Sequence, residues 1–107
     1  TTKAALIGFT KALARELADK NIRVNCICPG YIHTPLVDGM AEQSDPEDPK
    51  RAIDAIAAAV PLGRLGTPEE CGELCAFLAS DESSYLTGTQ IVIDGGSTLP
   101  ETSSMGQ

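Results

Sequence analysis

Residues 29–35, "PGYIHTP", place several ligand-binding chemistries in one short segment: a phenol, an imidazole, a hydroxyl and a tight turn. The segment follows an apolar stretch, "NIRVNCICPG", that predicts a short buried strand. In open α/β sheets ligands bind outside the carboxyl ends of the strands, so the segment lies where a ligand would meet it. Pro29 fixes the turn and Gly30 permits close backbone approach, and a plain turn is the alternative for both.

Three polar side chains near this turn have structural interpretations of their own. Thr34 can act as the N-cap of the segment that follows it. His33 is the only histidine in the chain, and alternation along the loop directs it away from its ligand-facing neighbours, so we expect a surface residue. Asn25 lies inside the predicted strand, where its amide must be hydrogen-bonded, and we expect it to hold backbone or turn geometry.

The four cysteines form two close pairs, Cys26 with Cys28 and Cys71 with Cys75. Neither spacing is the CxxC of a zinc ribbon or a redox motif. Two residues apart on a strand, or four apart on a helix, the members of each pair share one face. We therefore expect buried free thiols in a reducing cytosol and no metal; a metal site built from all four is the alternative.

Composition excludes several classes of function. Eight Lys and Arg against fifteen Asp and Glu give a net charge of −7, which disfavours nucleic-acid binding. No apolar run is long enough to span a bilayer, and the start lacks the pattern of a signal peptide. With 42% hydrophobic and 21% charged residues, the chain is typical of a soluble, cytoplasmic globular protein.

The elements that position these residues alternate between helices and strands. Helical patterns cover residues 2–19, 50–59 and 67–80, and a second apolar strand, "TQIVIDGG", follows the last helix. Thr67, Pro68 and Glu70 predict the start of that helix through a capping box. The stretch Leu36–Lys50 is acidic and interrupted by prolines, so we expect a mobile surface segment there; residues 80–88 are expected as a loop, and the chain after Leu99 as an unstructured or docked tail.

This inventory predicts an α/β fold that is incomplete. About two parallel strands and three helices cannot form a sheet covered on both faces, since doubly wound sheets usually need five or six strands. The first helix also carries two stripes that need partners: Leu6, Phe9, Leu13 and Leu17 on one, and Ala5, Gly8 and Ala12 on the other. We therefore expect this chain to be half of a fold.

The order of these motifs resembles one known family. The fragments "TTKAAL", "FTKALARELA", "IRVNCICPGYIHTPL", "GRLGTPEE" and "FLASDESSYLTGTQIVIDGG" follow one another as in the C-terminal half of short-chain dehydrogenases/reductases. The resemblance covers about residues 1–98. It implies the C-terminal part of a Rossmann-type doubly wound parallel sheet, with residues 1–99 as half of one domain, 36–60 as a variable substrate lid and 100–107 as a tail.

The resemblance implies a catalytic role for Lys3. It matches the lysine of the family's Tyr-x-x-x-Lys motif, whose tyrosine would stand two residues before Thr1. Residues four apart share a helix face, so the ammonium would favour the phenolate of a neighbouring tyrosine and bring its pKa towards the working range. The same ammonium could hold the ribose hydroxyls of the cofactor. The alternative is an ordinary solvated lysine.

The family also implies a cofactor, NAD or NADP, at the loop after the first strand. Pro29 and Gly30 would shape that loop, Ile32 would present backbone groups to the nicotinamide carboxamide, and Thr34 would bond the cofactor. Tyr31 would face the substrate. The implied reaction is hydride transfer between nicotinamide and a carbonyl or secondary alcohol, with a sugar or polyol, a small ketone or a steroid-like molecule as substrate.

Two functional hypotheses remain open at the level of the sequence. The first is an NAD(P)-dependent oxidoreductase that is active when complete, whereas the 107-residue piece alone is expected to be inactive. The second is a truncated, catalytically inactive fragment that retains only surfaces for oligomerisation. Under either hypothesis the stripe of small residues in the first helix and the region of the last helix and strand predict a homodimer or homotetramer.

Overall fold

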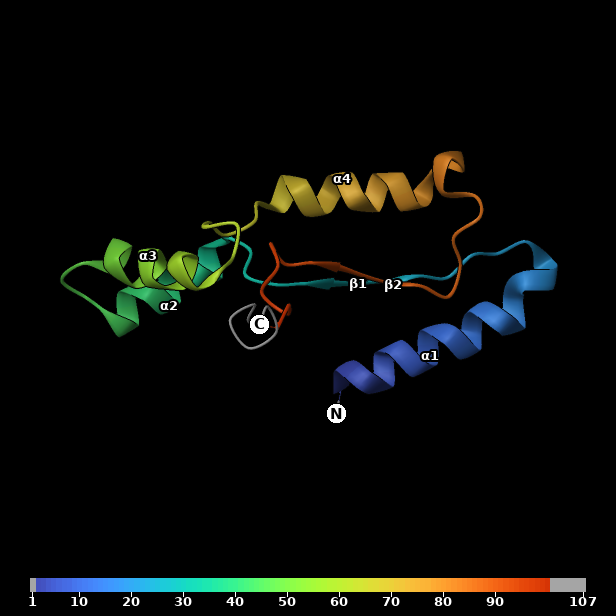
Figure 1. Cartoon of the computed structure of the whole chain (residues 1–107), viewed down its shortest axis with the longest axis horizontal. Coiled ribbons are helices and arrows are strands. Elements are labelled where there is room, and N and C mark those ends of the chain that lie inside the picture. The colour runs from blue at the N-terminus through green and yellow to red at the C-terminus, as the bar shows by residue number, and fades with distance from the viewer. Residues whose placement is uncertain (1, 101–107) are drawn as a thin grey trace, which may run out of the picture. The chain divides into compact units, whose positions relative to one another are not determined.

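The computed structural model describes residues 2–100, which form four α-helices and two strands (Figure 1). The predicted helices and both predicted strands are confirmed, with shorter bounds except for α3, which begins one residue earlier; short 3-10 helices follow α1 and α4, the second within the expected loop. Residues 101–107 of the expected tail lie outside the described residues. In chain order the main elements are α1 (Thr2–Leu17), β1 (Cys26–Pro29), α2 (Pro35–Ser44), α3 (Pro49–Ala59), α4 (Pro68–Ala79) and β2 (Gln90–Ile93).

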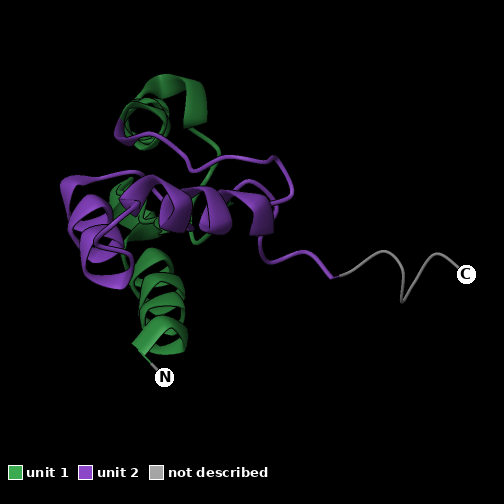
Figure 2. Cartoon of the chain, turned by 90° about the vertical axis from the view of Figure 1, so that its left-hand side faces the viewer, with its two compact units in different colours: residues 1–29, 69–93 green, residues 30–68, 94–107 purple. Residues whose placement is uncertain are grey.

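The chain divides into two compact units, coloured separately in Figure 2. Unit 1 consists of Thr1–Pro29 and Glu69–Ile93, and it contains α1, both strands and α4. Unit 2 consists of Gly30–Pro68 and Asp94–Gln107, and it contains α2 and α3. The loop after β1 therefore belongs to unit 2 from Gly30 onward.

Unit 1 is built on a parallel pair of strands. β1 and β2 pair from Cys26 opposite Gln90 to Pro29 opposite Ile93, and Figure 1 shows them between α4 on one side and α1 on the other. Cys26 and Cys28 are buried, as expected for alternate residues on one strand face. All four cysteines are free, but the expected burial is wrong for the second pair: Cys71 is half-buried and Cys75 is exposed on α4, which has no buried residue among those described. Within residues 2–100 no group of three or more His, Cys, Asp or Glu side chains could hold a metal ion.

Two polar side chains on the approach to β1 fasten distant segments of unit 1. The Arg23 guanidinium donates five hydrogen bonds of 2.9–3.3 Å to the end of α4 and the turn after it. Asn25 donates to the Leu86 carbonyl at 3.1 Å and accepts from the backbone N–H and the hydroxyl of Thr89. Asn25 thus holds backbone geometry, as predicted, and sets where β2 begins.

Unit 2 corrects one expectation. The acidic stretch Leu36–Lys50, expected to be a mobile surface segment, instead forms most of α2 and the start of α3. Thr34 caps α2 and Asp48 caps α3, and a proline follows each cap at a favourable first position. The two helices pack together, and Ala41 is only 3% exposed. Local capping and this packing outweigh the acidic composition.

Helix α1 buries little of its surface among the described residues. Only Thr10 and Ala14 are buried in it, whereas Leu6 is 47% and Phe9 is 62% exposed. The predicted stripe of Ala5, Gly8 and Ala12 is exposed as well. In the part of the chain that the structure describes, no helix has the length and apolar character needed to cross a membrane.

Candidate functional site

The loop after β1 is held by the turn that follows β2. A Cβ atom added to Gly30 would lie 2.6 Å from the Cβ of Asp94 and 2.9 Å from its Cα, so no side chain fits at Gly30. The Asp94 carboxylate accepts hydrogen bonds from the backbone N–H groups of Gly96 and Thr98 and from the Thr98 hydroxyl. The close backbone approach predicted for Gly30 is therefore made to this rigid turn of the chain itself.

Ile32 forms a short parallel bridge with Gly66. The His33 N–H donates to the Gly66 carbonyl, and the Gly66 N–H donates to the Tyr31 carbonyl, both at 2.9 Å. In a parallel bridge these bonds come from the residues on either side of Ile32, so the N–H and C=O of Ile32 itself point away from Gly66. Neither group has a backbone partner within residues 2–100.

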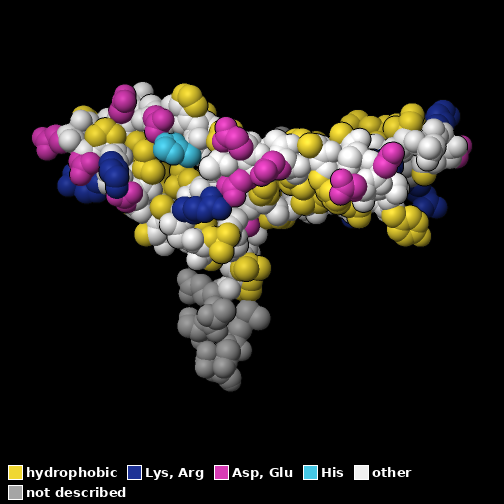
Figure 3. All heavy atoms as spheres, turned by 90° about the horizontal axis from the view of Figure 1, so that it is seen from above, with side chains coloured by type: hydrophobic (Ala, Val, Ile, Leu, Met, Phe, Trp, Pro, Cys, Tyr) yellow, Lys and Arg dark blue, Asp and Glu magenta, His cyan; other side chains and the backbone are white. Residues whose placement is uncertain are grey.

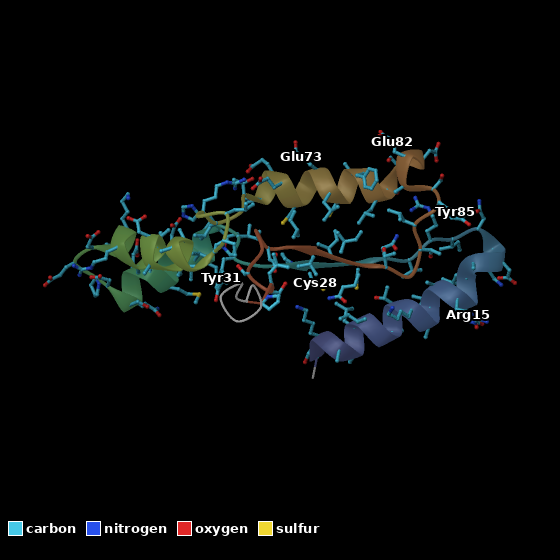
Figure 4. The ribbon with its side chains drawn as sticks, viewed as in Figure 1. Arg15, Cys28, Tyr31, Glu73, Glu82 and Tyr85 are labelled. Atoms are coloured by element: carbon cyan, nitrogen blue, oxygen red, sulfur yellow. The ribbon has the colours of Figure 1, made fainter. Side chains whose placement is uncertain are left out.

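Thr34 and Tyr31 flank this bridge in unit 2. The Thr34 hydroxyl accepts a long hydrogen bond of 3.5 Å from the Val37 N–H and so serves as the N-cap of α2. The structure thus confirms the capping alternative for Thr34. Capping uses an oxygen lone pair and leaves the hydroxyl proton free to donate elsewhere. The Tyr31 side chain, labelled in Figure 4, is 54% exposed.

His33 has a structural partner. Its Nε2 atom lies 2.7 Å from Oδ1 of Asp38, and both side chains are about half exposed. Asp38 lies in the first turn of α2, where a carboxylate also interacts favourably with the helix dipole. His33 is a surface residue, as predicted, and it fastens α2 to the loop that precedes it.

The remaining predicted site residues belong to unit 1. Lys3 lies in the first turn of α1 and is exposed, and Pro29 is the last residue of β1. The structure therefore brings Gly30, Tyr31, Ile32 and Thr34 together within unit 2, while Lys3 and Pro29 are elements of unit 1.

The hairpin of α2 and α3 carries its own charge pairs. Arg51 Nε lies 2.6 Å from Oδ2 of Asp45, and Lys50 Nζ lies 2.9 Å from Oδ2 of Asp54. The hydrogen bond from Arg51 lowers the pKa of the Asp45 carboxyl and raises the pKa of Arg51. The hydrogen bond to Asp54 likewise raises the pKa of Lys50. At the left of Figure 3, Asp and Glu side chains lie beside Lys and Arg side chains on the surface.

Two features of the site escaped prediction from the sequence. Helix α2 begins with Thr34 followed by Pro35, the same Thr-Pro signal that correctly predicted the start of α4 at Pro68. The same signal at Thr34 and Pro35 therefore indicates the start of α2. The pairing of Ile32 with Gly66 had no local signal, because a bridge between segments more than 30 residues apart depends on how the chain folds back.

Comparison with known proteins places this geometry in a family. The family model described as enoyl-(acyl carrier protein) reductase matches residues 1–98. The chain belongs to the short-chain dehydrogenase/reductase family. Oxidoreductase UcpA of Escherichia coli (strain K12) is 64% identical over 105 residues, which are 98% of this chain and 40% of that protein. Dehydrogenase/reductase SDR family member 6 of Rattus norvegicus is 47% identical over 98 residues, 92% of this chain and 39% of that protein. The chain thus spans about two fifths of the length of these relatives.

Solved structures of the same family share the fold. L-sorbose reductase of Gluconobacter frateurii, solved with NADPH and L-sorbose, matches with a TM-score of 0.88 and 38% identity, covering 94% of this chain and 40% of that one. Aldohexose dehydrogenase of Thermoplasma acidophilum matches with a TM-score of 0.83 and 40% identity, covering 92% and 40%. The helices and parallel strands described above are therefore part of an α/β Rossmann fold of the short-chain dehydrogenase/reductase type, and the expected fold class is confirmed.

Proposed function

We propose that this chain is the C-terminal part of an NAD(P)-dependent oxidoreductase that interconverts a carbonyl and a secondary alcohol. The observation that carries the proposal is the backbone of Ile32, whose N–H and C=O point away from the bridge to Gly66 and have no backbone partner within residues 2–100. A primary carboxamide offers one acceptor oxygen and an N–H donor, so it can bond both groups at once. Nicotinamide carries such a carboxamide.

The rest of the loop supports the same ligand. Thr34 keeps a hydroxyl proton after capping α2, and that proton can be donated to a cofactor oxygen. Gly30, packed against Asp94, and Pro29 fix the path of the backbone on which Ile32 sits. When bound, the nicotinamide supplies or receives the hydride. The chain's own residues bind and orient it.

Lys3 is the residue of this chain proposed to act in proton transfer. Its exposed ammonium on the first turn of α1 is available to a tyrosine one helical turn upstream and to ribose hydroxyls. A neighbouring cation favours the phenolate, which lets that tyrosine exchange a proton with the substrate oxygen near neutral pH. Tyr31, half exposed in the binding loop, is proposed to contact the substrate.

The proposal extends to the cofactor and the assembly. NADPH in the L-sorbose reductase structure supports a nicotinamide cofactor, and NAD and NADP both remain candidates because the residue that reads the ribose 2′ position lies early in such folds. We propose a cytoplasmic homodimer or homotetramer in which the exposed stripe of Ala5, Gly8 and Ala12 contacts another helix. The same exposure supports the alternative, a separate fragment that only pairs with other subunits.

Replacing Lys3 tests the function most directly. In the complete protein that contains this chain, we expect Lys3→Met to lower kcat by about 100-fold or more, because proton transfer loses its supporting cation. Lys11→Met, which removes an exposed lysine from the same helix, is the matched control and should keep wild-type kinetics. Unchanged kcat and unchanged cofactor affinity in Lys3→Met would refute the proposed role.

Replacing Thr34 separates cofactor binding from helix capping. We expect Thr34→Ala to weaken cofactor binding in a fluorescence titration more than it lowers the free energy of unfolding, whose loss should be about 1 kcal/mol. Thr34→Ser keeps the hydroxyl and should restore both. If Thr34→Ala keeps the cofactor affinity and only its stability falls, Thr34 is a cap and nothing more.

The fragment alternative has its own test. The isolated chain, identified by its mass of 11.2 kDa, should turn over no substrate with either cofactor if it needs the rest of the fold. Turnover by this chain alone would contradict the proposal that it is only part of the active unit.

A further inference from the structure

We infer that the substrate is an uncharged carbonyl or alcohol with an apolar portion, and that the hairpin of α2 and α3 selects it against carboxylates and phosphates. The inference rests on the proposed function and adds the class of substrate. It follows from two independent features of unit 2: where its cations are engaged, and which apolar side chains it leaves exposed beside the binding loop.

The hairpin offers no uncommitted cation to an anionic substrate. Its charged side chains are six acids and two bases, and both bases are engaged inside the hairpin, Lys50 with Asp54 and Arg51 with Asp45. Of the other basic side chains in the described part of unit 2, Arg64 donates to the Leu65 carbonyl and His33 lies 2.7 Å from Asp38. The net field of the hairpin is negative, so a carboxylate or phosphate approaching it is repelled and finds no bidentate partner. The acids of the hairpin are Asp38, Glu42, Asp45, Glu47, Asp48 and Asp54.

One face of α2 is apolar and is left exposed by the described part of unit 2. Leu36 is 73% exposed and Met40 is 57% exposed, and residues four apart lie on the same side of a helix. Ala41, by contrast, is buried. Leu36 comes only two residues after Thr34, so this face begins directly at the loop proposed to hold the cofactor. A substrate with an apolar portion gains contact there without having to bring a charge near the acids.

The test compares two ketones of the same length in the complete protein, one ending in a carboxamide and the other in a carboxylate. At low ionic strength we expect kcat/KM for the carboxamide to exceed that for the carboxylate by about 10-fold or more. This ratio should decrease when added salt shortens the Debye length to about 4 Å and screens the charges of the hairpin. Equal or better use of the carboxylate at low salt would overturn the inference, while leaving the proposed function in place.

A pair of charge variants locates the effect. Glu42→Lys changes the charge of α2, and we expect it to narrow the ratio between the two ketones. Glu73→Lys makes the same change on α4, where Glu73 is exposed and lies on the side away from the strands (Figure 4), and it should leave the ratio unchanged. An equal effect of both variants would mean that net charge of the protein, and not the hairpin, sets the preference, which would overturn the assignment.

A homologous series of unbranched ketones tests the apolar face. In the wild type we expect kcat/KM to rise by about 2- to 4-fold for each added methylene, the effect of burying one such group. Leu36→Ser and Met40→Ser should flatten this dependence. If they leave it unchanged but alter the oligomeric state in sedimentation, a second copy covers the face and the inference fails. If no ketone or alcohol is turned over with either cofactor, the proposed function itself fails, and this inference with it.

Discussion

Different kinds of contact stabilise the interior of each unit of this chain. In unit 1, Arg23 and Asn25 bond to groups 55–64 residues away in the sequence. In the hairpin of unit 2, the caps and ion pairs join residues only three to six apart. Unit 1 is therefore a framework stabilised by long-range polar contacts. The helices of the hairpin are instead stabilised by caps and ion pairs between residues close in the sequence.

This difference suggests how stability and specificity are divided. Side-chain changes in the hairpin alter short-range contacts on exposed surfaces, which contribute little to folding. A change at Arg23 instead leaves several main-chain carbonyls without a donor. Side-chain changes in the hairpin should therefore disturb the fold less than changes at Arg23.

Replacing Arg23 should give the largest effect. We expect Arg23→Gln to lower the free energy of unfolding of the complete protein by about 3 kcal/mol, because charge-assisted hydrogen bonds are lost and part-buried carbonyls remain unpaired. Arg15→Gln removes an exposed arginine of α1 and serves as the control (Figure 4). Urea unfolding measures both. If the two variants have similar free energies of unfolding, the long-range hydrogen bonds of Arg23 do not stabilise unit 1, and the contrast with the hairpin fails.

A pair of glycine replacements gives the next effect, with opposite signs. Gly30→Ala should destabilise by about 2 kcal/mol, because the new Cβ cannot fit against Asp94, and it should weaken cofactor binding by shifting the loop. Gly39→Ala, in the interior of α2 with nothing within 4 Å, should stabilise by about 1 kcal/mol. Thermal unfolding of both variants provides the measurement. If Gly30→Ala leaves the stability unchanged, the loop must be able to shift and accommodate the new Cβ beside Asp94.

The smallest effect concerns pH and the pair of Asp45 with Arg51. The hydrogen bond from Arg51 lowers the pKa of Asp45 in the folded state below its ordinary value of 3.8. The contribution of this pair to the stability is therefore fully present above pH 3.8. It is lost as the pH falls through the lower pKa that Asp45 has in the folded state. We expect Asp45→Asn to have a slightly lower Tm than the wild type at pH 6 and the same Tm near pH 2. A Tm difference that persists at pH 2 would assign the effect to packing.

Much of the fold could be read from local patterns, and the exceptions have a physical cause. The Thr-Pro start of α4, the alternation around Cys26 and Cys28, and the turn after β2 are properties of a few neighbouring residues. The segment from Leu36 to Lys50 is helical despite its acidic composition, because the caps at Thr34 and Asp48 and the packing of α2 against α3 stabilise both helices. For the candidate site, the residue types and the family could be predicted from the sequence, but the partners of Ile32, Gly30 and His33 could not.

By itself, the sequence determined three of the four helices, both strands, the burial of Cys26 and Cys28, and the family. These follow from side-chain pattern and capping, which act over a few residues. Only the tertiary structure decided that the N–H and C=O of Ile32 have no backbone partner among the described residues, that Gly30 packs against Asp94, and that Arg23 bonds to the end of α4. Each of these depends on segments 34 or more residues apart meeting in space, because hydrogen bonding and close packing act between neighbours in the fold rather than neighbours in the chain.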